Sequence, residues 1–263
     1  MSLITISTDF GWNDPYVGIM KGVILGINLQ VQLVDLTHGL SHHHLLEAAF
    51  KLHSAYPYFP VDSIHLVVVD PGVGGERRVI GIQSGEHTWI GPDNGLFTLV
   101  VKENPGAAII HVHDERYLLH SVSRTFHGRD IMAPVAAHLS LGVPLTEMGS
   151  PITDPVLISL PDLEQGGEGI IGQVLWADHF GNLITNFRQK DLAVLADPMN
   201  LKIIVGADSI MGIRENYAQE TPGNLMALFG SGGYLEIACN LGSAADKVGY
   251  EAGKKLKVKV IRN

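Results

Sequence analysis

The sequence has little of what extracellular, membrane or nucleic-acid-binding proteins need. One cysteine, Cys239, rules out an internal disulfide and is compatible with a reducing compartment. No run of about 18 apolar residues occurs, and the N-terminal MSLITIST shows no secretory signal. The net charge of -9 argues against nucleic acid, since phosphate binding needs clustered cations. We expect a cytoplasmic protein with neither nucleic acid nor membrane as a partner.

Several common catalytic motifs are also absent. Neither G-x-x-x-x-G-K-[ST] nor G-x-S-x-G occurs, and Cys239 has no evident base near it in the sequence. The glycines of 71–75 do not spell G-x-G-x-x-G, and we expect a strand rather than a helix after them. Nucleotide phosphate binding and a serine or cysteine nucleophile are therefore poorly supported.

Histidines are frequent, but their spacing does not favour a metal site. His42, His43 and His44 are expected where a helix opens, and consecutive helix positions point about 100° apart, so they cannot all face one ion. His111 and His113 would share one face of a strand, yet no further ligand follows at a useful spacing. We expect no metal and no cofactor, and a metal-dependent hydrolase is the weakest alternative.

The first 150 residues alternate short β-branched strands with amphipathic helices, which indicates an α/β domain with a largely parallel central sheet. Asp14 and Pro15 resemble an N-cap followed by proline at the first helical position, with the helix ending near Ile27. The other expected helices open within 39–44, at 96 and at 131, and the expected strands are 3–7, 31–34, 64–69, 79–82, 88–90 and 109–112.

The segment 149–168 is rich in proline and glycine without a helical period, which is typical of a linker. We therefore predict an α/β domain at 1–150, a linker at 151–168 and a β domain at 169–263. Short strands separated by turns predict a smaller β-barrel-like fold there. They are expected at 169–176, 183–186, 201–205, 225–229, 234–238 and 256–261.

Acidic residues follow the strands of the first domain. Asp70 ends the most apolar strand, and Asp9 ends the first one. Open α/β sheets bind their ligands at this edge, although a simple turn residue would occupy the same position as Asp70. Asp35 is interpreted as a turn residue. His127, beside a glycine where a helix begins, can reach into a cleft, although a lone histidine there is more often structural.

Six segments in order resemble one known family. They are Ser7–Gly11, Asp70–Gly74 with Glu76 and Arg77, Pro92–Gly95, Phe126–Asp130, Asp178–Asn182 and Gly233–Ala238. Together they resemble the S-adenosyl-L-methionine hydroxide adenosyltransferases, to which fluorinase and chlorinase are related. The resemblance covers nearly the whole chain and implies an α/β N-terminal domain and a β C-terminal domain. It also implies homotrimers, with the substrate between the N-terminal domain of one subunit and the C-terminal domain of the next.

The resemblance further implies an enzyme that hydrolyses S-adenosyl-L-methionine to adenosine and L-methionine without a cofactor. Its catalytic residues would be Asp70, Arg77 and His127, with Arg78 left open as an alternative to its neighbour. We expect His127, oriented by Asp70, to take a proton from water that attacks the ribose 5′ carbon, and Arg77 to stabilise the developing hydroxide.

The implied substrate contacts lie in both domains. Asp9 would accept hydrogen bonds from the ribose diol, and Asp14 and Asp178 would hold the methionine ammonium group. The remaining implied contacts are Phe180 and Asn182 to adenine, Ser231 near the methionine carboxylate, and Glu236, which could equally be an ordinary strand residue.

Three departures separate the sequence from the halogenases. These enzymes carry tyrosine at the positions of Asp70 and His127, and they have a long insertion where this chain has a short turn at 84–86. Both differences favour water over halide. Gly232 stands where the halogenases have an arginine that helps to bind the methionine carboxylate, so that contact stays open. The alternatives are a non-catalytic adenosine or S-adenosylmethionine binding protein and a halide-using relative, and product detection distinguishes them.

Overall fold

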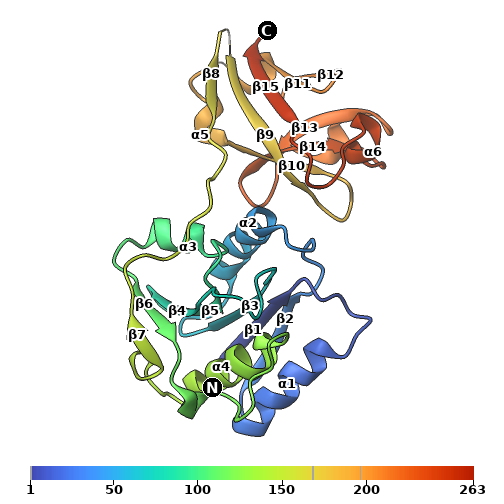
Figure 1. Cartoon of the computed structure of the whole chain (residues 1–263). Helices are drawn as coiled ribbons and strands as arrows, with labels where there is room; N and C mark the ends of the chain where they lie inside the picture. The colour runs from blue at the N-terminus through green and yellow to red at the C-terminus, as the bar shows by residue number, and fades with distance from the viewer. Residues whose placement is uncertain (1, 168, 196) are drawn as a thin grey trace. The chain divides into compact units, whose positions relative to one another are not determined.

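The computed structural model describes residues 2–167, 169–195 and 197–263. The chain divides into two compact units, Met1–Ile158 and Ser159–Asn263, each with its own sheet (Figure 1). No helix among these described residues is long and apolar enough to cross a membrane.

The N-terminal unit contains a seven-stranded mixed sheet. In sheet order its strands are β2 (Gln32–Thr37), β1 (Leu3–Thr8), β3 (Ile64–Val68), β5 (His87–Pro92), β4 (Val79–Ser84), β6 (Ala108–Val112) and β7 (Gly149–Pro151). The first four run parallel, and each later strand is antiparallel to its neighbour. The predicted α/β class is confirmed, and Pro151, placed in the predicted linker, completes β7.

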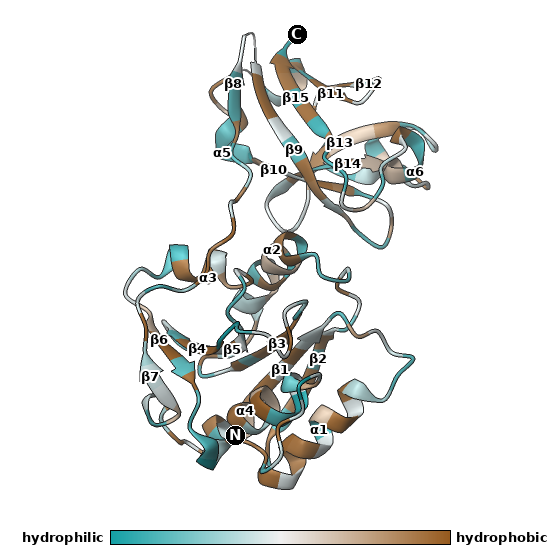
Figure 2. Cartoon of the chain, in the orientation of Figure 1, coloured by the Kyte–Doolittle hydropathy of each residue, from teal (hydrophilic) through white to brown (hydrophobic). Residues whose placement is uncertain are grey.

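Helices cover both faces of this sheet. They are α1 (Tyr16–Ile27), α2 (Leu45–Ala55), α3 (Thr98–Glu103), a π-helical turn (Gly128–Met132) that continues into α4 (Ala133–Ser140), and single 3₁₀ turns at Tyr56–Tyr58, Glu115–Tyr117 and Leu145–Glu147. Helices α1 and α4 pack in one apolar cluster and α2 and α3 in another. In Figure 2 the strands of this sheet are predominantly hydrophobic.

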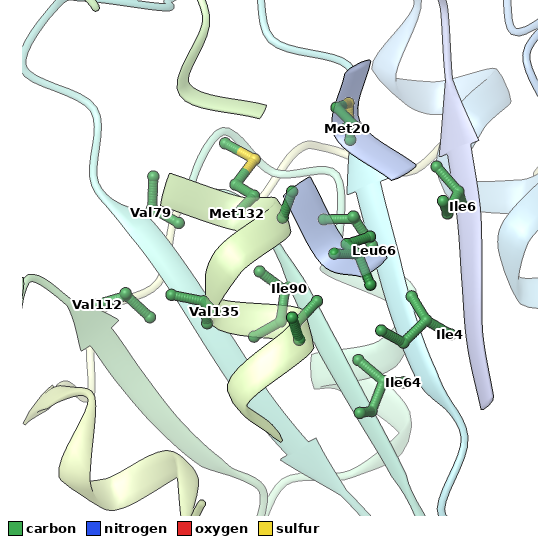
Figure 3. Packing of buried hydrophobic residues seen from close by; sticks show 14 of the residues in the cluster. Ile4, Ile6, Met20, Ile64, Leu66, Val79, Ile90, Val112, Met132 and Val135 are labelled. Atoms are coloured by element: carbon green, nitrogen blue, oxygen red, sulfur yellow. The ribbon is translucent and has the colours of Figure 1, made fainter. Parts of the chain in front are cut away.

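Strand β3 is buried on both faces, as the sequence predicted. Leu66 and Val68 pack with Met20 of α1 and with Met132, whereas Val67 and Val69 belong to the cluster around Trp89 on the opposite face. Figure 3 shows Leu66 among Met20, Met132 and Ile90. Since side chains alternate along a strand, an apolar run of this kind requires cover on both sides. This packing fixes the end of β3, and with it Asp70.

Two helix starts differ from the prediction. Helix α1 begins at Tyr16 with Pro15 as its N-cap, so Asp14 is not the capping residue. Helix α2 begins at Leu45, so the three adjacent histidines precede the helix instead of opening it. His43 adopts φ 61°, a left-handed conformation that interrupts helical geometry just before α2. Both corrections leave polar residues in loops at the edge of the sheet.

The C-terminal unit is an antiparallel, barrel-like sheet, which confirms that part of the predicted fold. Its strands are β8 (Glu164–Gly166), β9 (Gly169–Ala177), β10 (Leu183–Arg188), β11 (Leu201–Val205), β12 (Asp208–Met211), β13 (Leu225–Phe229), β14 (Tyr234–Cys239) and β15 (Lys257–Arg262), with short helices α5 (Gln189–Leu192) and α6 (Ala244–Val248) and 3₁₀ turns at Pro198–Asn200 and Tyr217–Gln219.

The C-terminal sheet nearly closes on itself. Its path runs β12-β11-β15-β9-β10-β14-β13, with β8 paired to β9. Just after β12, the Arg214 N–H donates to the Ala227 carbonyl of β13 at 2.7 Å. The interior is apolar and includes Leu183, Phe187 and Val258. The loops between these strands carry Asp178, Asn182 and Ser231, whereas Glu236 lies within β14.

Candidate active site

Two carboxylates meet at one edge of the N-terminal sheet. Asp9 directly follows β1, and Asp70 follows β3, its parallel neighbour, with Thr8 and Val68 in register. Parallel strands bring their carboxyl ends to the same edge, where open α/β sheets bind ligands. Both side chains line a cavity of about 320 Å³. Its other lining residues are Phe10, Asp14, Tyr16, His42, His43, Val68, Val73, Thr125, Phe126, His127 and Gly128.

The predicted catalytic residues form one hydrogen-bonded group. Arg77 Nε donates to Asp70 Oδ1 at 2.8 Å and Oδ2 at 3.0 Å, and its Nη2 also donates to Oδ2. The same Nη2 lies 2.8 Å from His127 Nδ1. The Asp70 and Arg77 side chains are only 5% and 10% exposed, so water screens this ion pair weakly. Arg77 therefore bridges the carboxylate and the imidazole.

Close backbone packing brings these three side chains together. Gly74, at φ 77°, lies so near the Arg124 carbonyl that a Cβ would sit 2.1 Å from its oxygen. Gly128 opens the π-helical turn, and a Cβ there would approach Val68 Cγ1 of β3 to 3.2 Å. Glycine at both positions lets the loop before Arg77 and the turn after His127 converge on the end of β3.

The protonation of His127 follows from its partner. Guanidinium groups only donate, so Nδ1 accepts from Arg77 and a neutral ring carries its proton on Nε2. Burial, followed by the charge of Arg77, lowers the pKa of His127 below its ordinary value of 6.5, against opposing effects of Asp70 and Asp130. We expected Asp70 to orient His127, but Arg77 takes that place because its guanidinium lies between the two side chains.

Arg78 points to a different part of the structure. Its Nε donates to Asp93 Oδ2 at 2.8 Å, and its Nη1 donates to Asp154 Oδ1 at 2.8 Å. These hydrogen bonds, with the two carboxylate charges, raise the pKa of the guanidinium. Of the two adjacent arginines, only Arg77 contacts Asp70 and His127 in the described structure.

Asp9 is held from the side of the loop before α2. Its side chain is buried, and its Oδ2 accepts the backbone N–H of His43 at 3.1 Å. His43 makes this bond from its left-handed conformation, which costs free energy for a residue with a Cβ and is most often retained near functional sites. Asp14 lines the same cavity from an exposed position.

Three aromatic rings form part of the cavity wall, and no role was predicted for them. Phe10, Tyr16 and Phe126 pack edge to face, with centroid separations of 5.8, 6.0 and 5.4 Å. Phe10 and Phe126 lie inside the segments that resembled the family, next to Asp9 and His127, and that adjacency was the available signal. His42 and His43 also line the cavity, but no three metal-ligating side chains gather among the described residues.

In the C-terminal unit, Asp178 organises the turn between β9 and β10. Its Oδ1 accepts the backbone N–H groups of Phe180 at 2.9 Å and Asn182 at 2.8 Å, and its Oδ2 accepts Asn182 Nδ2 at 2.9 Å. Asn182 is buried, whereas the Phe180 ring is 74% exposed. The turn thus presents an exposed aromatic residue, which suits stacking on a planar heterocycle.

Glu236 of β14 lies close to this turn, together with an aromatic residue that the sequence did not single out. Tyr217 Oη donates to Glu236 Oε2 at 3.1 Å. Burial raises the pKa of Glu236, with the Tyr217 bond opposing and the charge of Asp178 adding to the shift. Burial and Glu236 raise the pKa of Tyr217 to about 12. Ser231 is exposed in the adjacent β13–β14 turn.

A larger cavity exists in this unit but contains none of the predicted residues. It measures about 830 Å³ and lies around Gln189, Asp197, Arg214 and Phe229. The volume of a cavity therefore does not identify the site, because the predicted catalytic residues lie at the smaller cavity of the N-terminal unit. The structure brings Asp9, Asp14, Asp70, Arg77 and His127 together in the N-terminal unit.

Comparison with known proteins places both units in one family. Residues 4–149 match the SAM hydroxide adenosyltransferase N-terminal domain, and residues 172–257 match its C-terminal domain. The chain is 37% identical to a Thermus thermophilus protein named (R)-S-adenosyl-L-methionine hydrolase, over 95% of this chain and 97% of that protein. A Nocardia brasiliensis fluorinase is more distant, at 25% identity over 98% of this chain and 97% of that enzyme.

A solved structure is similar over nearly the full chain. A crystal structure of an uncharacterized conserved protein from Thermotoga maritima superposes with a TM-score of 0.91 at 32% identity, covering 98% of this chain and all of that one. The matches to both domains, together with full-length relatives above 30% identity, show that the chain belongs to the SAM hydroxide adenosyltransferase family.

Proposed function

We propose that the protein hydrolyses S-adenosyl-L-methionine to adenosine and L-methionine. The observation that carries this is the hydrogen-bonded group of Asp70, Arg77 and His127 beside a cavity of about 320 Å³, in a chain of this family. Relatives at 32 to 37% identity that are named (R)-S-adenosyl-L-methionine hydrolase support the same reaction. The proposal includes no metal and no cofactor.

The chemistry needs only a well-placed nucleophile. The sulfonium of the substrate is a good leaving group, so displacement at the ribose 5′ carbon depends on holding water in line with the carbon–sulfur bond. The oxygen bonds to the 5′ carbon, the carbon–sulfur electron pair stays on methionine, and the water proton passes to a base. A cavity that holds both water and the ribose meets this requirement.

The proposed path of the proton differs from the sequence-based expectation, and the bond between Arg77 and His127 supports this change. With Nδ1 of His127 accepting from Arg77 and Nε2 protonated, the ring has no lone pair for a water proton. Asp70 is then the acceptor within the group, because Oδ1 accepts one bond from Arg77 and keeps a second lone pair, whereas Oδ2 accepts two. His127 and Arg77 act as donors that stabilise the developing hydroxide, an electrostatic contribution typical of such sites.

Substrate binding is proposed for the acidic residues around the cavity. Asp9 keeps Oδ1 available after Oδ2 accepts from His43, which suits a vicinal diol that donates two hydrogen bonds. Asp14, exposed at the rim, would attract the methionine ammonium group. The aromatic wall of Phe10, Tyr16 and Phe126 supports a cationic sulfonium nearby, since ring faces attract cations.

We also propose that the C-terminal unit completes the site. Phe180 and Asn182 would contact adenine, Asp178 the ammonium group, and Ser231 the methionine carboxylate, while Glu236 would contact the substrate beside them. The exposed Phe180 side chain and the half-buried carboxyl of Glu236 support this assignment. In this proposal the protein is a homotrimer in which the N-terminal unit of one subunit and the C-terminal unit of the next share each substrate.

The test is to incubate the purified protein with the (R) and (S) sulfonium epimers of S-adenosylmethionine and to separate the products by chromatography. The expected products are adenosine and methionine, with unchanged turnover after addition of a chelator. Tight binding without products would indicate a non-catalytic binding protein, and a 5′-halogenated adenosine in chloride buffer would indicate a halide-using enzyme. Either result would overturn the proposal.

A further inference from the structure

Two threonines of β1 make the same kind of buried hydrogen bond. Thr8 Oγ1 lies 2.8 Å from His38 Nδ1, and Thr5 Oγ1 lies 2.8 Å from His65 Nδ1. All four side chains are buried, with exposed fractions of 0 or 1%. Thr8 directly precedes Asp9 at the cavity, whereas Thr5 lies farther back along the strand and does not line it. The two pairs differ in their position relative to the site and in the partner of the second ring nitrogen, which is Asp35 for His38 and His87 for His65.

The carboxylate of Asp35 sets the direction of the Thr8–His38 bond. His38 Nε2 lies 2.9 Å from Asp35 Oδ1, and Lys21 Nζ donates to Asp35 Oδ2 at 2.5 Å. Burial would raise the pKa of Asp35, but the bonds from Lys21 and His38 outweigh it and lower that pKa, so Asp35 is an ionised acceptor. Nε2–H of His38 thus donates to Asp35, and in the neutral ring Nδ1 accepts the Thr8 hydroxyl proton.

The chain of bonds continues into the loop after β1. Thr8 Oγ1, whose proton points to His38, accepts the Phe10 N–H at 3.2 Å. The His38 carbonyl accepts the Gly11 N–H at 2.8 Å, and the Trp12 ring packs edge-on against the His38 ring with centroids 4.5 Å apart. Three consecutive loop residues are therefore held by His38, directly or through Thr8.

The hydrogen bonds from Thr8 through His38 and Asp35 to Lys21, here called the relay, connect the start of this loop with the helix after it. Thr8 begins it, and Lys21 belongs to α1, the helix that follows it. Within the loop, Oδ2 of Asp9 accepts the His43 N–H, and Oδ1 accepts no hydrogen bond from the described residues. Phe10 packs against Phe126, the residue before His127. A change in these hydrogen bonds would therefore be transmitted to the Asp9 carboxylate and to the cavity wall.

We propose that Thr8 and His38 are positioning residues that preset Asp9 for the ribose diol and Phe10 for the cavity wall. This inference rests on the proposed function. A diol held by Asp9 fixes the ribose, and hence the 5′ carbon, relative to the water beside Asp70. Misplacement by about 1 Å can lower a rate by about 10²-fold, so a buried hydroxyl that touches no substrate can still control turnover.

The first experiment compares Thr8→Val with Thr5→Val. Each substitution keeps the branched shape, removes one buried hydroxyl and leaves one histidine nitrogen without its partner, so both should lower the thermal unfolding midpoint. Thr8→Val should lower it somewhat more, because the Phe10 N–H also loses its acceptor. Only Thr8→Val should lower kcat/KM, by about 10- to 100-fold. Thr8→Ser should restore most of it, and Thr5→Val should stay within about twofold of wild type. Equal losses in both valine variants would show a structural role only.

A double-mutant cycle tests the route through Asp9. If Thr8 acts by placing the Asp9 carboxylate, Thr8→Val should change kcat/KM by no more than about twofold in an Asp9→Asn background, because the acceptor it positions is already impaired. Multiplicative losses in the double variant would contradict the placement of Asp9 by Thr8. Circular dichroism of each variant verifies the fold before its kinetics are interpreted.

A binding ratio separates this inference from the proposed function. Calorimetry would compare adenosine with 2′,3′-dideoxyadenosine, which lacks the diol. Wild type should prefer adenosine, and Thr8→Val and Asp9→Asn should both reduce that preference while Thr5→Val keeps it. Suppose that wild type turns over S-adenosylmethionine. If it shows no preference for adenosine, or if Thr8→Val keeps the wild-type preference, the positioning role alone would be overturned. A wild type with the predicted ratios but no turnover would overturn the hydrolase function alone.

Discussion

Arg77 Nη2 lies 2.8 Å from His127 Nδ1 and donates to it, so the imidazole proton belongs on Nε2. The same guanidinium donates to both oxygens of Asp70. One arginine thereby determines the direction of every hydrogen bond within the group. In the mechanism that we propose, Asp70 is the proton acceptor and His127 a donor, and several measurable consequences depend on that assignment.

The first consequence concerns the two adjacent arginines. Arg77→Lys should lower kcat by about 10²-fold or more, since one ammonium cannot reproduce the forked contact with Asp70 and His127. Asp70→Asn should lower it at least as much while adenosine binding persists. Arg78→Lys is the matched control, because Arg78 bonds to Asp93 and Asp154 instead. Full activity in Arg77→Lys or Asp70→Asn would refute the assignment.

A second consequence is the titration of His127. Burial and the charge of Arg77 depress its pKa in the folded protein, so NMR of the ring protons should show a midpoint below 6.5. Arg77→Gln should move this pKa upward, because it removes the positive charge, and Asp70→Asn should move it further down. Because the pKa of His127 is depressed, its neutral form is present near neutral pH. Protonation of Nδ1 would break the bond from Arg77, so kcat/KM should fall as the pH drops through the folded pKa. A wild-type midpoint above 6.5 would contradict this account.

The proposed site between subunits makes a third prediction. Asp9→Ala and Asn182→Ala should each inactivate the protein, but mixed oligomers should regain part of the activity. In such an oligomer an intact N-terminal unit from one variant can face an intact C-terminal unit from the other. Activity is measured after subunit exchange, with mixing verified by native mass spectrometry. No recovery in verified mixtures would place the complete site within one chain.

A fourth prediction uses a histidine outside the site. Burial, with a smaller effect of His87, lowers the pKa of His65 to about 3. The unfolded chain takes up a proton near pH 6.5 and the folded one does not, so this group makes stability fall by about 1.4 kcal/mol per pH unit below 6.5. Urea unfolding should show that the advantage of wild type over His65→Gln shrinks by about 2 kcal/mol from pH 6.5 to 5. A constant difference would argue against a neutral buried His65.

The sequence predicted the strands that carry the site, because a run of apolar residues that ends in a carboxylate can be recognised from a few neighbouring positions. β3 and Asp70 illustrate this, as does β1 with Asp9. The exact start of a helix and the presence of a very short strand were less predictable. Asp14 has the chemistry of an N-cap, yet α1 begins after Pro15, and the four-residue strand β12 was missed because its sequence alternates too briefly.

Relations between distant residues were beyond a single sequence. Arg77 and His127 are 50 positions apart, and nothing in either segment shows which arginine reaches the ring or which nitrogen accepts. The Tyr217 bond to Glu236 and the His43 bond to Asp9 depend likewise on loops that meet only in three dimensions. The resemblance to a family suggested Arg77 and His127, but the direction of proton transfer required the hydrogen-bond geometry.

The most direct test of the central claim is the fate of the oxygen atom. If water beside Asp70, Arg77 and His127 attacks the 5′ carbon, turnover in ¹⁸O-water should place one labelled oxygen in the 5′ hydroxyl of adenosine and none in methionine. Mass spectrometry of the two separated products measures this. Label in methionine, or release of adenine as the free base, would contradict attack at the 5′ carbon and with it the proposed function.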